Sequence, residues 1–174
     1  IIEASMKRLQ TSQVDLIHIH ALTGEDDLAK IEAKDGVLNV LYKLRDQKVT
    51  RFIGVTCHND PAVLKTALER HDFDCTQMAL NAAQAGMSQD VQGSFENIAL
   101  PVALRKRMGV TAMKIFAQDK LVGQAPAEKL IQYVLSLPVA AAIIGMPRLD
   151  LLEADVKVAK SFRRMPKAEM RELS

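Results

Sequence analysis

The chain has 174 residues, enough to bury a core as one domain or as part of a larger one. Its 23 Lys and Arg residues balance 21 Asp and Glu residues, and only 4% of its residues are aromatic, which argues against a nucleic-acid partner. The longest strongly apolar stretch, at 134–145, contains a proline and is too short to span a membrane.

The cysteines and the start of the sequence bear on its compartment. Cys57 and Cys75 lie in or near strand-like runs, and their spacing matches neither a disulfide framework nor a metal-ligand motif. Free buried thiols are typical of a reducing compartment. The opening segment, IIEASMKRLQ, is amphipathic and has neither an initiating methionine nor a signal-peptide pattern. We therefore expect a cytoplasmic protein with no membrane partner, and a sequence that begins inside a longer one.

Five short apolar runs alternate with helical patterns along the chain. Most of these runs are near-continuous, which is typical of parallel strands covered on both faces. The runs are VDLIHI at 14–19, RFIGVT at 51–56, FDCTQMAL at 73–80, GVTAMKIF at 109–116 and PVAAAIIG at 138–145.

Helical patterns with recognisable starts lie between and after these runs. A capping residue or a proline is expected to begin each of three helices. The starts and the apolar faces are Asp35 before Val37, Leu41 and Leu44; Asp60-Pro61 before Val63, Leu64 and Leu68; and Pro126 before Leu130, Ile131, Val134 and Leu135. Leu149, Leu152 and Val156 mark a last long helix.

Repeated strand-helix units predict a parallel sheet. No Gly-x-Gly-x-x-Gly follows any run, so the Rossmann fingerprint is absent. Two architectures stay open, which are an open doubly wound sheet and five units of a (β/α)8 barrel. A full barrel takes about 250 residues, so the chain would then be the larger part of one.

In either architecture the chemistry lies at the carboxyl ends of the strands. Polar side chains gather at these ends in the sequence, at His20, Thr56 to His58, Gln77 to Asn81, Lys114, and Gly145 to Arg148. The sequence therefore predicts a functional rim. His18, two residues before His20 and on the same strand face, is expected to be a satisfied interior histidine.

Four ordered segments resemble the C-terminal part of an aldo/keto reductase. They are EASMKRLQTSQVDLIHIH, LRDQKVTRFIGVTCHND, MGVTAMKIFAQDKLVG and AAIIGMPRLDLLEADV. The family's counterparts are a SLKRLxxDxxDLYxxH helix and strand, an IGVSN or IGVTGH strand, and an IPGxxxxxxLEEN segment. The resemblance covers nearly the whole chain. It implies an incomplete (β/α)8 TIM-type barrel, with residues 1–174 as its C-terminal portion and the N-terminal units absent.

The resemblance implies a role for three residues near the reacting atoms. His20 matches the active-site histidine, whose imidazole hydrogen-bonds the substrate carbonyl and stabilises the developing oxyanion. Thr56 and Gln77 match the hydroxyl and the amide that meet the nicotinamide carboxamide. Cys57 replaces the family's usual asparagine or glycine.

It also implies contacts with the rest of the cofactor. Lys114 could reach the pyrophosphate. Gly145 and Arg148 belong to the segment that holds the adenosine phosphate at a helix N-terminus. There Gly145 would permit a close turn, and Arg148 would bind a 2′-phosphate, which favours NADP (NADPH) over NAD.

The family mechanism needs a tyrosine as general acid, with a lysine and an aspartate. Only Tyr42 and Tyr133 are present, and both lie inside helical patterns. We therefore expect an NAD(P)H-dependent oxidoreductase for a small aldehyde or ketone that is truncated and inactive alone, and that self-associates through exposed barrel edges. The alternatives are a catalytically silent nucleotide-binding or assembly module, and an unrelated open α/β binding domain.

Overall fold

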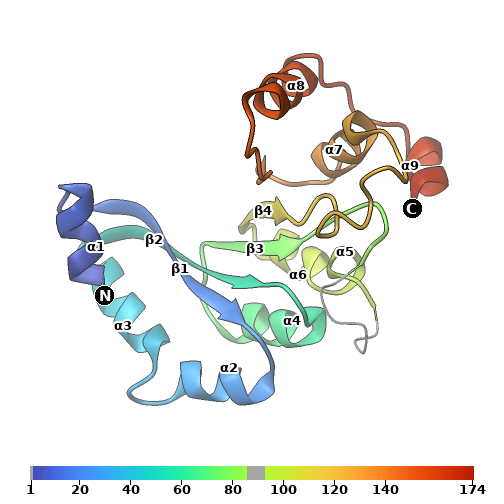
Figure 1. The fold of residues 1–174 in the computed structure, drawn as a ribbon. Coiled ribbons are helices and arrows are strands. Elements are labelled where there is room, and N and C mark those ends of the chain that lie inside the picture. The colour runs from blue at the N-terminus through green and yellow to red at the C-terminus, as the bar shows by residue number, and fades with distance from the viewer. Residues whose placement is uncertain (1, 86–92) are drawn as a thin grey trace.

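The computed structural model describes residues 2–85 and 93–174, which form one five-stranded sheet with helices along it (Figure 1). All four strand pairs are parallel, and the strand order follows the chain order. A doubly wound sheet would reverse its order, so the sequential order is that of a barrel. The barrel is not closed. The strands are β1 (Val14–Leu22), β2 (Thr50–Cys57), β3 (Cys75–Ala79), β4 (Gly109–Met113) and β5 (Ala141–Ala142).

Helices follow every strand, as the sequence predicts. They are α1 (Ile2–Leu9), α2 (Glu25–Glu32), α3 (Val37–Asp46), α4 (Pro61–Arg70), α5 (Phe95–Ile98), α6 (Leu100–Arg105), α7 (Ala127–Ser136), α8 (Leu149–Lys160) and α9 (Lys167–Leu173). The sequence patterns missed α2, α5, α6 and α9. In the described ranges, no helix is long and apolar enough to cross a membrane.

The core lies between the sheet and its helices. Ile53 and Val55 of β2 and Leu64 of α4 are fully buried there. The other face of the sheet is partly open, because Leu16 and its register partner Phe52 are 40% and 42% exposed. The expectation of strands covered on both faces is therefore wrong for this part of the sheet.

The predicted start of α4 is confirmed and that of α3 is wrong. The Asp60 carboxylate accepts hydrogen bonds from the amides of Ala62 and Val63, at 2.9 and 3.0 Å. Gly36, and not Asp35, precedes α3, with no side-chain cap. A Cβ at Gly36 would overlap the carbonyl oxygens at the end of α2, so close packing determines this helix start.

The last two units are shorter or more exposed than the sequence suggests. β5 has two residues in place of the expected run at 138–145, although the amides of Ala140 and Ile143 extend its pairing to β4 at 2.7 and 2.8 Å. Helix α7 begins after Pro126 and buries Leu130, Ile131 and Val134, as predicted. Helix α8 forms, but Leu149, Leu152 and Val156 are 69%, 40% and 41% exposed.

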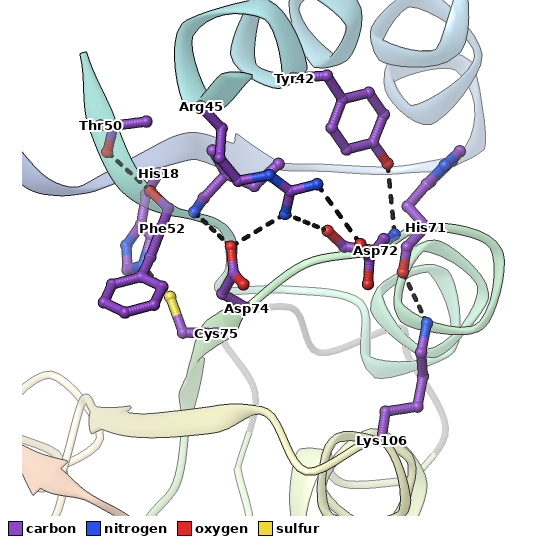
Figure 2. Close-up of polar contacts among 11 residues, drawn as sticks. His18, Tyr42, Arg45, Thr50, Phe52, His71, Asp72, Asp74, Cys75 and Lys106 are labelled. Atoms are coloured by element: carbon purple, nitrogen blue, oxygen red, sulfur yellow. Dashed lines mark hydrogen bonds and ion pairs between the residues drawn. The ribbon is translucent and has the colours of Figure 1, made fainter. Parts of the chain in front are cut away.

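Polar contacts fix the amino end of β3 against its neighbours (Figure 2). The Asp74 carboxylate accepts hydrogen bonds from the amide of Ile53 and from the Arg45 guanidinium, at 2.9 and 3.1 Å. Arg45 also donates to the carbonyl oxygen of Asp72 at 3.2 Å. This cluster lies at the amino ends of the strands, where barrels are stabilised, and it leaves the carboxyl ends for chemistry.

Candidate functional site

The predicted residues on the central strands converge at the carboxyl ends of the sheet. A cleft of about 450 Å³ is lined there by His58, Gln77, Lys114 and Gly145, together with Met113 and Phe116. Lys114 follows β4 with a backbone φ of 58°. The cleft therefore brings together three of the six predicted site residues. The other three, His20, Thr56 and Arg148, are not among its lining residues.

Thr56 and Gln77 lie side by side on the face that carries the cleft. Thr56 pairs in register with Gln77, and Gln77 pairs with Thr111, so their side chains share one face of the sheet. Gln77 accepts a hydrogen bond from the Thr111 hydroxyl at 3.3 Å, and its amide nitrogen lies 3.4 Å from the Met113 sulfur. A sulfur is a weak acceptor, so the amide keeps most of its bonding capacity.

The Thr56 hydroxyl is unusual because it is buried without a partner. Thr56 is 1% exposed. Among the residues that the structure describes, Oγ1 of Thr56 is the one buried side-chain nitrogen or oxygen that makes no hydrogen bond. An unpaired buried hydroxyl is costly, so its presence calls for an explanation.

His20 lies beside a second histidine that had no predicted role. The Nε2 atoms of His20 and His58 are 3.4 Å apart, and the rings meet edge to face at 86°. Burial lowers the pKa of His58, as do the charges of Lys114 and His20. Sequence reasoning placed His58 at a strand end but could not see that it faces His20.

His18 is a satisfied interior histidine, as predicted. Its Nε2 atom lies 3.0 Å from the Cys75 Sγ atom, across Gly54 of the intervening strand (Figure 2). Burial, and then the charge of His20, lower the His18 pKa. Burial, and then Asp74, raise the pKa of Cys75 to about 11. The pair is therefore a neutral imidazole and a neutral thiol at pH 7.

Neither the other thiol nor the two tyrosines reach the cleft. The Cys57 thiol donates to the carbonyl oxygen of Asp60 at 3.3 Å, on the sheet face opposite Thr56. The Tyr133 hydroxyl donates to Glu96 at 2.9 Å, and burial raises its pKa further above the usual value. The Tyr42 hydroxyl accepts from the amide of Asp72, near the amino end of β3.

The segment after β5 differs in detail from the sequence expectation. Gly145 has an ordinary backbone φ, and a Cβ there would meet no atom within 4 Å, so the predicted close turn is wrong. Arg148 precedes α8, and its Nε and Nη2 atoms donate to the two Asp150 carboxylate oxygens at 2.9 and 2.7 Å. The Arg148 hydrogen bond lowers the Asp150 pKa. Both side chains are exposed, so a phosphate would compete with Asp150 for the guanidinium.

Comparison with known proteins shows which fold this arrangement belongs to. No protein-family model and no curated protein sequence matches the chain. Among solved structures, the holo form of the aldo-keto reductase AKR11C1 from Bacillus halodurans is 20% identical, with a TM-score of 0.72 over 99% of this chain and 61% of that one. The thermostable aldo-keto reductase Tm1743, solved with the inhibitor epalrestat, is 20% identical, with a TM-score of 0.72 over 99% of this chain and 63% of that one.

The fold is therefore the one found in aldo-keto reductases, as the sequence resemblance implies. More particularly, the chain corresponds to a partial barrel, because it spans under two thirds of the length of these structures.

Proposed function

We propose that the chain forms the cofactor-facing part of an oxidoreductase of the aldo-keto reductase kind, which reduces a small aldehyde or ketone with a nicotinamide cofactor. The observation that carries the proposal is the buried, unpaired Thr56 hydroxyl beside the Gln77 amide. Together they offer a hydroxyl and an amide that can each donate and accept, which suits a carboxamide. The fold, which is the one found in aldo-keto reductases, supports the same function.

Four of the six predicted site residues act near the reacting atoms or the pyrophosphate in this proposal. A bound nicotinamide cofactor supplies the hydride. Thr56 and Gln77 would hold the carboxamide of a bound cofactor and so orient its ring, and Lys114, at the cleft wall, would bind the pyrophosphate. The exposed imidazole of His20 donates a hydrogen bond to the substrate carbonyl oxygen, which stabilises the negative charge that develops there.

The proposed preference for NADP over NAD rests on Arg148, and we expect it to be weaker than the sequence suggests. A guanidinium suits a 2′-phosphate, whereas a carboxylate suits a ribose 2′-hydroxyl. Arg148 and Asp150 offer both groups within one ion pair. We propose NADP as the favoured cofactor, with Asp150 reducing the margin.

We further propose that residues 1–174 are the C-terminal portion of such a barrel and do not turn over alone. Neither tyrosine of the chain lies at the cleft, so no phenol there can give the proton that a reduced carbonyl oxygen needs. Strands β1 and β5 each pair with a single neighbour within the described residues, and such edges favour self-association. The two free thiols are consistent with a cytoplasmic location.

The second candidate is a catalytically silent module for nucleotide binding or assembly. It is favoured by the same observation, that both tyrosines lie away from the cleft. A nucleotide-binding module predicts the same cofactor binding as the first candidate but no turnover once the remaining barrel units are supplied, whereas an assembly module predicts no nucleotide binding.

The first experiment is a titration of the chain with NADPH, followed by protein-dependent nicotinamide fluorescence, with NADH as the comparator. Saturable binding that favours NADPH, without turnover of benzaldehyde, is the expected result. A folded chain that binds neither nucleotide would contradict the cofactor proposal and favour an assembly role.

A further inference from the structure

His58 lies at the candidate site, although neither the family resemblance nor the proposed function gives it a role. It directly follows β2, and it lines the cleft beside Gln77 and Lys114. His20 of the neighbouring strand β1 is not among the lining residues, but it lies next to His58. His58 is therefore the imidazole that borders the space proposed for the nicotinamide.

The two imidazoles approach each other through the same ring atom. Their rings meet edge to face at 86°, and their Nε2 atoms are 3.4 Å apart. One oxygen atom can lie about 2.9 Å from both nitrogens, with an angle of roughly 70° between the two hydrogen bonds. A carbonyl oxygen has two lone pairs and can accept both bonds. The pair therefore has the spacing of two donors that share one oxygen, as in an oxyanion hole.

The surroundings of His58 keep its ring neutral and favour an anionic oxygen beside it. Burial lowers its pKa, and the positive charges of Lys114 and His20 lower it further. A proton on His58 is therefore opposed by the Lys114 ammonium, whereas a negative oxygen at the same place is attracted by it. The local charges thus suit an oxygen that becomes negative when a carbonyl is reduced.

The other two histidines are not available for this role. His18 Nε2 lies 3.0 Å from the Cys75 sulfur, and His71 Nε2 lies 2.7 Å from a Glu32 carboxylate oxygen. Each of these nitrogens already has a close protein partner. At the rim, by contrast, two like nitrogens face each other at 3.4 Å, which is long for a hydrogen bond. An oxygen that accepts from both would therefore displace only a weak contact.

We propose that His58 is a second hydrogen-bond donor to the substrate, so that the carbonyl oxygen lies between the Nε2 atoms of His20 and His58. The inference rests on the proposed function, which already places His20 at that oxygen. In the complex each ring carries its proton on Nε2, because a carbonyl oxygen only accepts. His58 stabilises the developing negative charge and transfers no proton, so the oxygen still needs a proton donor.

The test is a titration of the chain, labelled with ¹⁵N-histidine, with sodium benzoate in the absence of nucleotide, followed by nuclear magnetic resonance. The benzoate carboxylate is a stable group with the negative oxygen that reduction develops. Saturable binding should bring Nε2 of both His20 and His58 into the N–H form and shift both signals. His18 and His71 are internal controls whose signals should not move. Sodium chloride at equal concentration controls for charge alone.

Two substitutions separate the donor from the shape of the ring. His58→Phe keeps a planar ring without a donor and should weaken benzoate binding by about 10-fold, as expected for one hydrogen bond to a charged group. His58→Gln keeps an N–H group and should restore most of the affinity. Circular dichroism checks that both variants are folded. The signals of the wild-type chain keep the proposal falsifiable if His58→Phe does not fold.

The proposal is overturned if benzoate does not bind saturably, if only the His20 signal shifts, if His58→Phe keeps its affinity, or if the two variants lose affinity equally. The proposed reductase function fails by a different result, which is the absence of nucleotide binding. A chain that binds NADPH but fails the benzoate test therefore keeps the proposed function and loses only this role of His58.

Discussion

The imidazole of His18 reaches the thiol of Cys75 across a strand that separates them, and it can do so because Gly54 has no side chain. A Cβ at Gly54 would lie 2.5 Å from both Cys75 Sγ and His18 Cδ2. The three residues pair in register on β1, β2 and β3. The glycine in IGVT is therefore required by packing across three strands and not by a turn.

Gly54→Ala should destabilise the chain, because the added methyl group must displace two packed side chains. Overpacking of this kind costs about 1–3 kcal/mol. Urea unfolding measures the loss. Gly145→Ala is the matched control, since its Cβ meets no atom within 4 Å and its stability should not fall. Equal stability of the two variants would contradict the packing argument.

Cys75 should react slowly with alkylating reagents at neutral pH. Burial raises its pKa from 9.0 to about 11, so at pH 8 its thiolate fraction is roughly a hundredfold below that of an ordinary thiol. The rate should rise with pH up to about 11, because only the thiolate attacks. Iodoacetamide labelling followed by mass spectrometry, in a Cys57→Ser background, gives the profile. A midpoint near 9 in the folded chain would show that the thiol is not held as the structure has it.

Two buried threonines on neighbouring strands should respond oppositely to the same substitution. Thr56→Val removes an unpaired hydroxyl and should stabilise the free chain by about 1 kcal/mol. Thr76→Val removes a hydroxyl that donates to the Val55 carbonyl oxygen at 3.1 Å, and should destabilise by about 1 kcal/mol. Thermal unfolding of both variants makes the comparison.

Nucleotide affinity should change in the opposite sense to stability, so the variant that gains stability should be the one that loses affinity. Thr56→Val removes a group that the proposal places on the carboxamide, whereas the Thr76 hydroxyl is already bonded to the Val55 carbonyl oxygen. Thr76 lies on the opposite face of the sheet from Thr56 and Gln77, so Thr56→Val should lose affinity for NADPH and Thr76→Val should keep it. A stabilised Thr56→Val chain with unchanged affinity would mean that the hydroxyl serves no cofactor.

The strands were predictable because buried parallel strands leave near-continuous apolar runs, as at 51–56 and 109–116. Periodicity left the order of the strands open, and only the resemblance to aldo/keto reductases implied the sequential order of a barrel. The missed start of α3 depends on how Gly36 packs against α2, a contact between two helices. A short element such as α5 (Phe95–Ile98) offers too few residues for a periodic signal.

The candidate site, like the fold, was only partly predictable from the sequence. Strand-end polarity pointed to Thr56 and Gln77, but only the register shows that they are neighbours. The contact between His58 and His20 depends on the pairing of β1 with β2, which the sequence does not show. Asp150 was overlooked because its effect on Arg148 comes from the local path of the chain into α8.

The ion pair at the start of α8 allows the proposed preference for NADP to be tested at single positions. Asp150→Asn frees the Arg148 guanidinium from a charged competitor, so affinity for NADPH should rise while affinity for NADH changes little or falls. Arg148→Ala should weaken NADPH binding much more than NADH binding, because it removes the cation that a 2′-phosphate needs. Fluorescence titrations of both variants with both nucleotides give four affinities. Equal losses for NADPH and NADH in Arg148→Ala would show that the phosphate does not bind there, and the NADP preference would have no residue to support it.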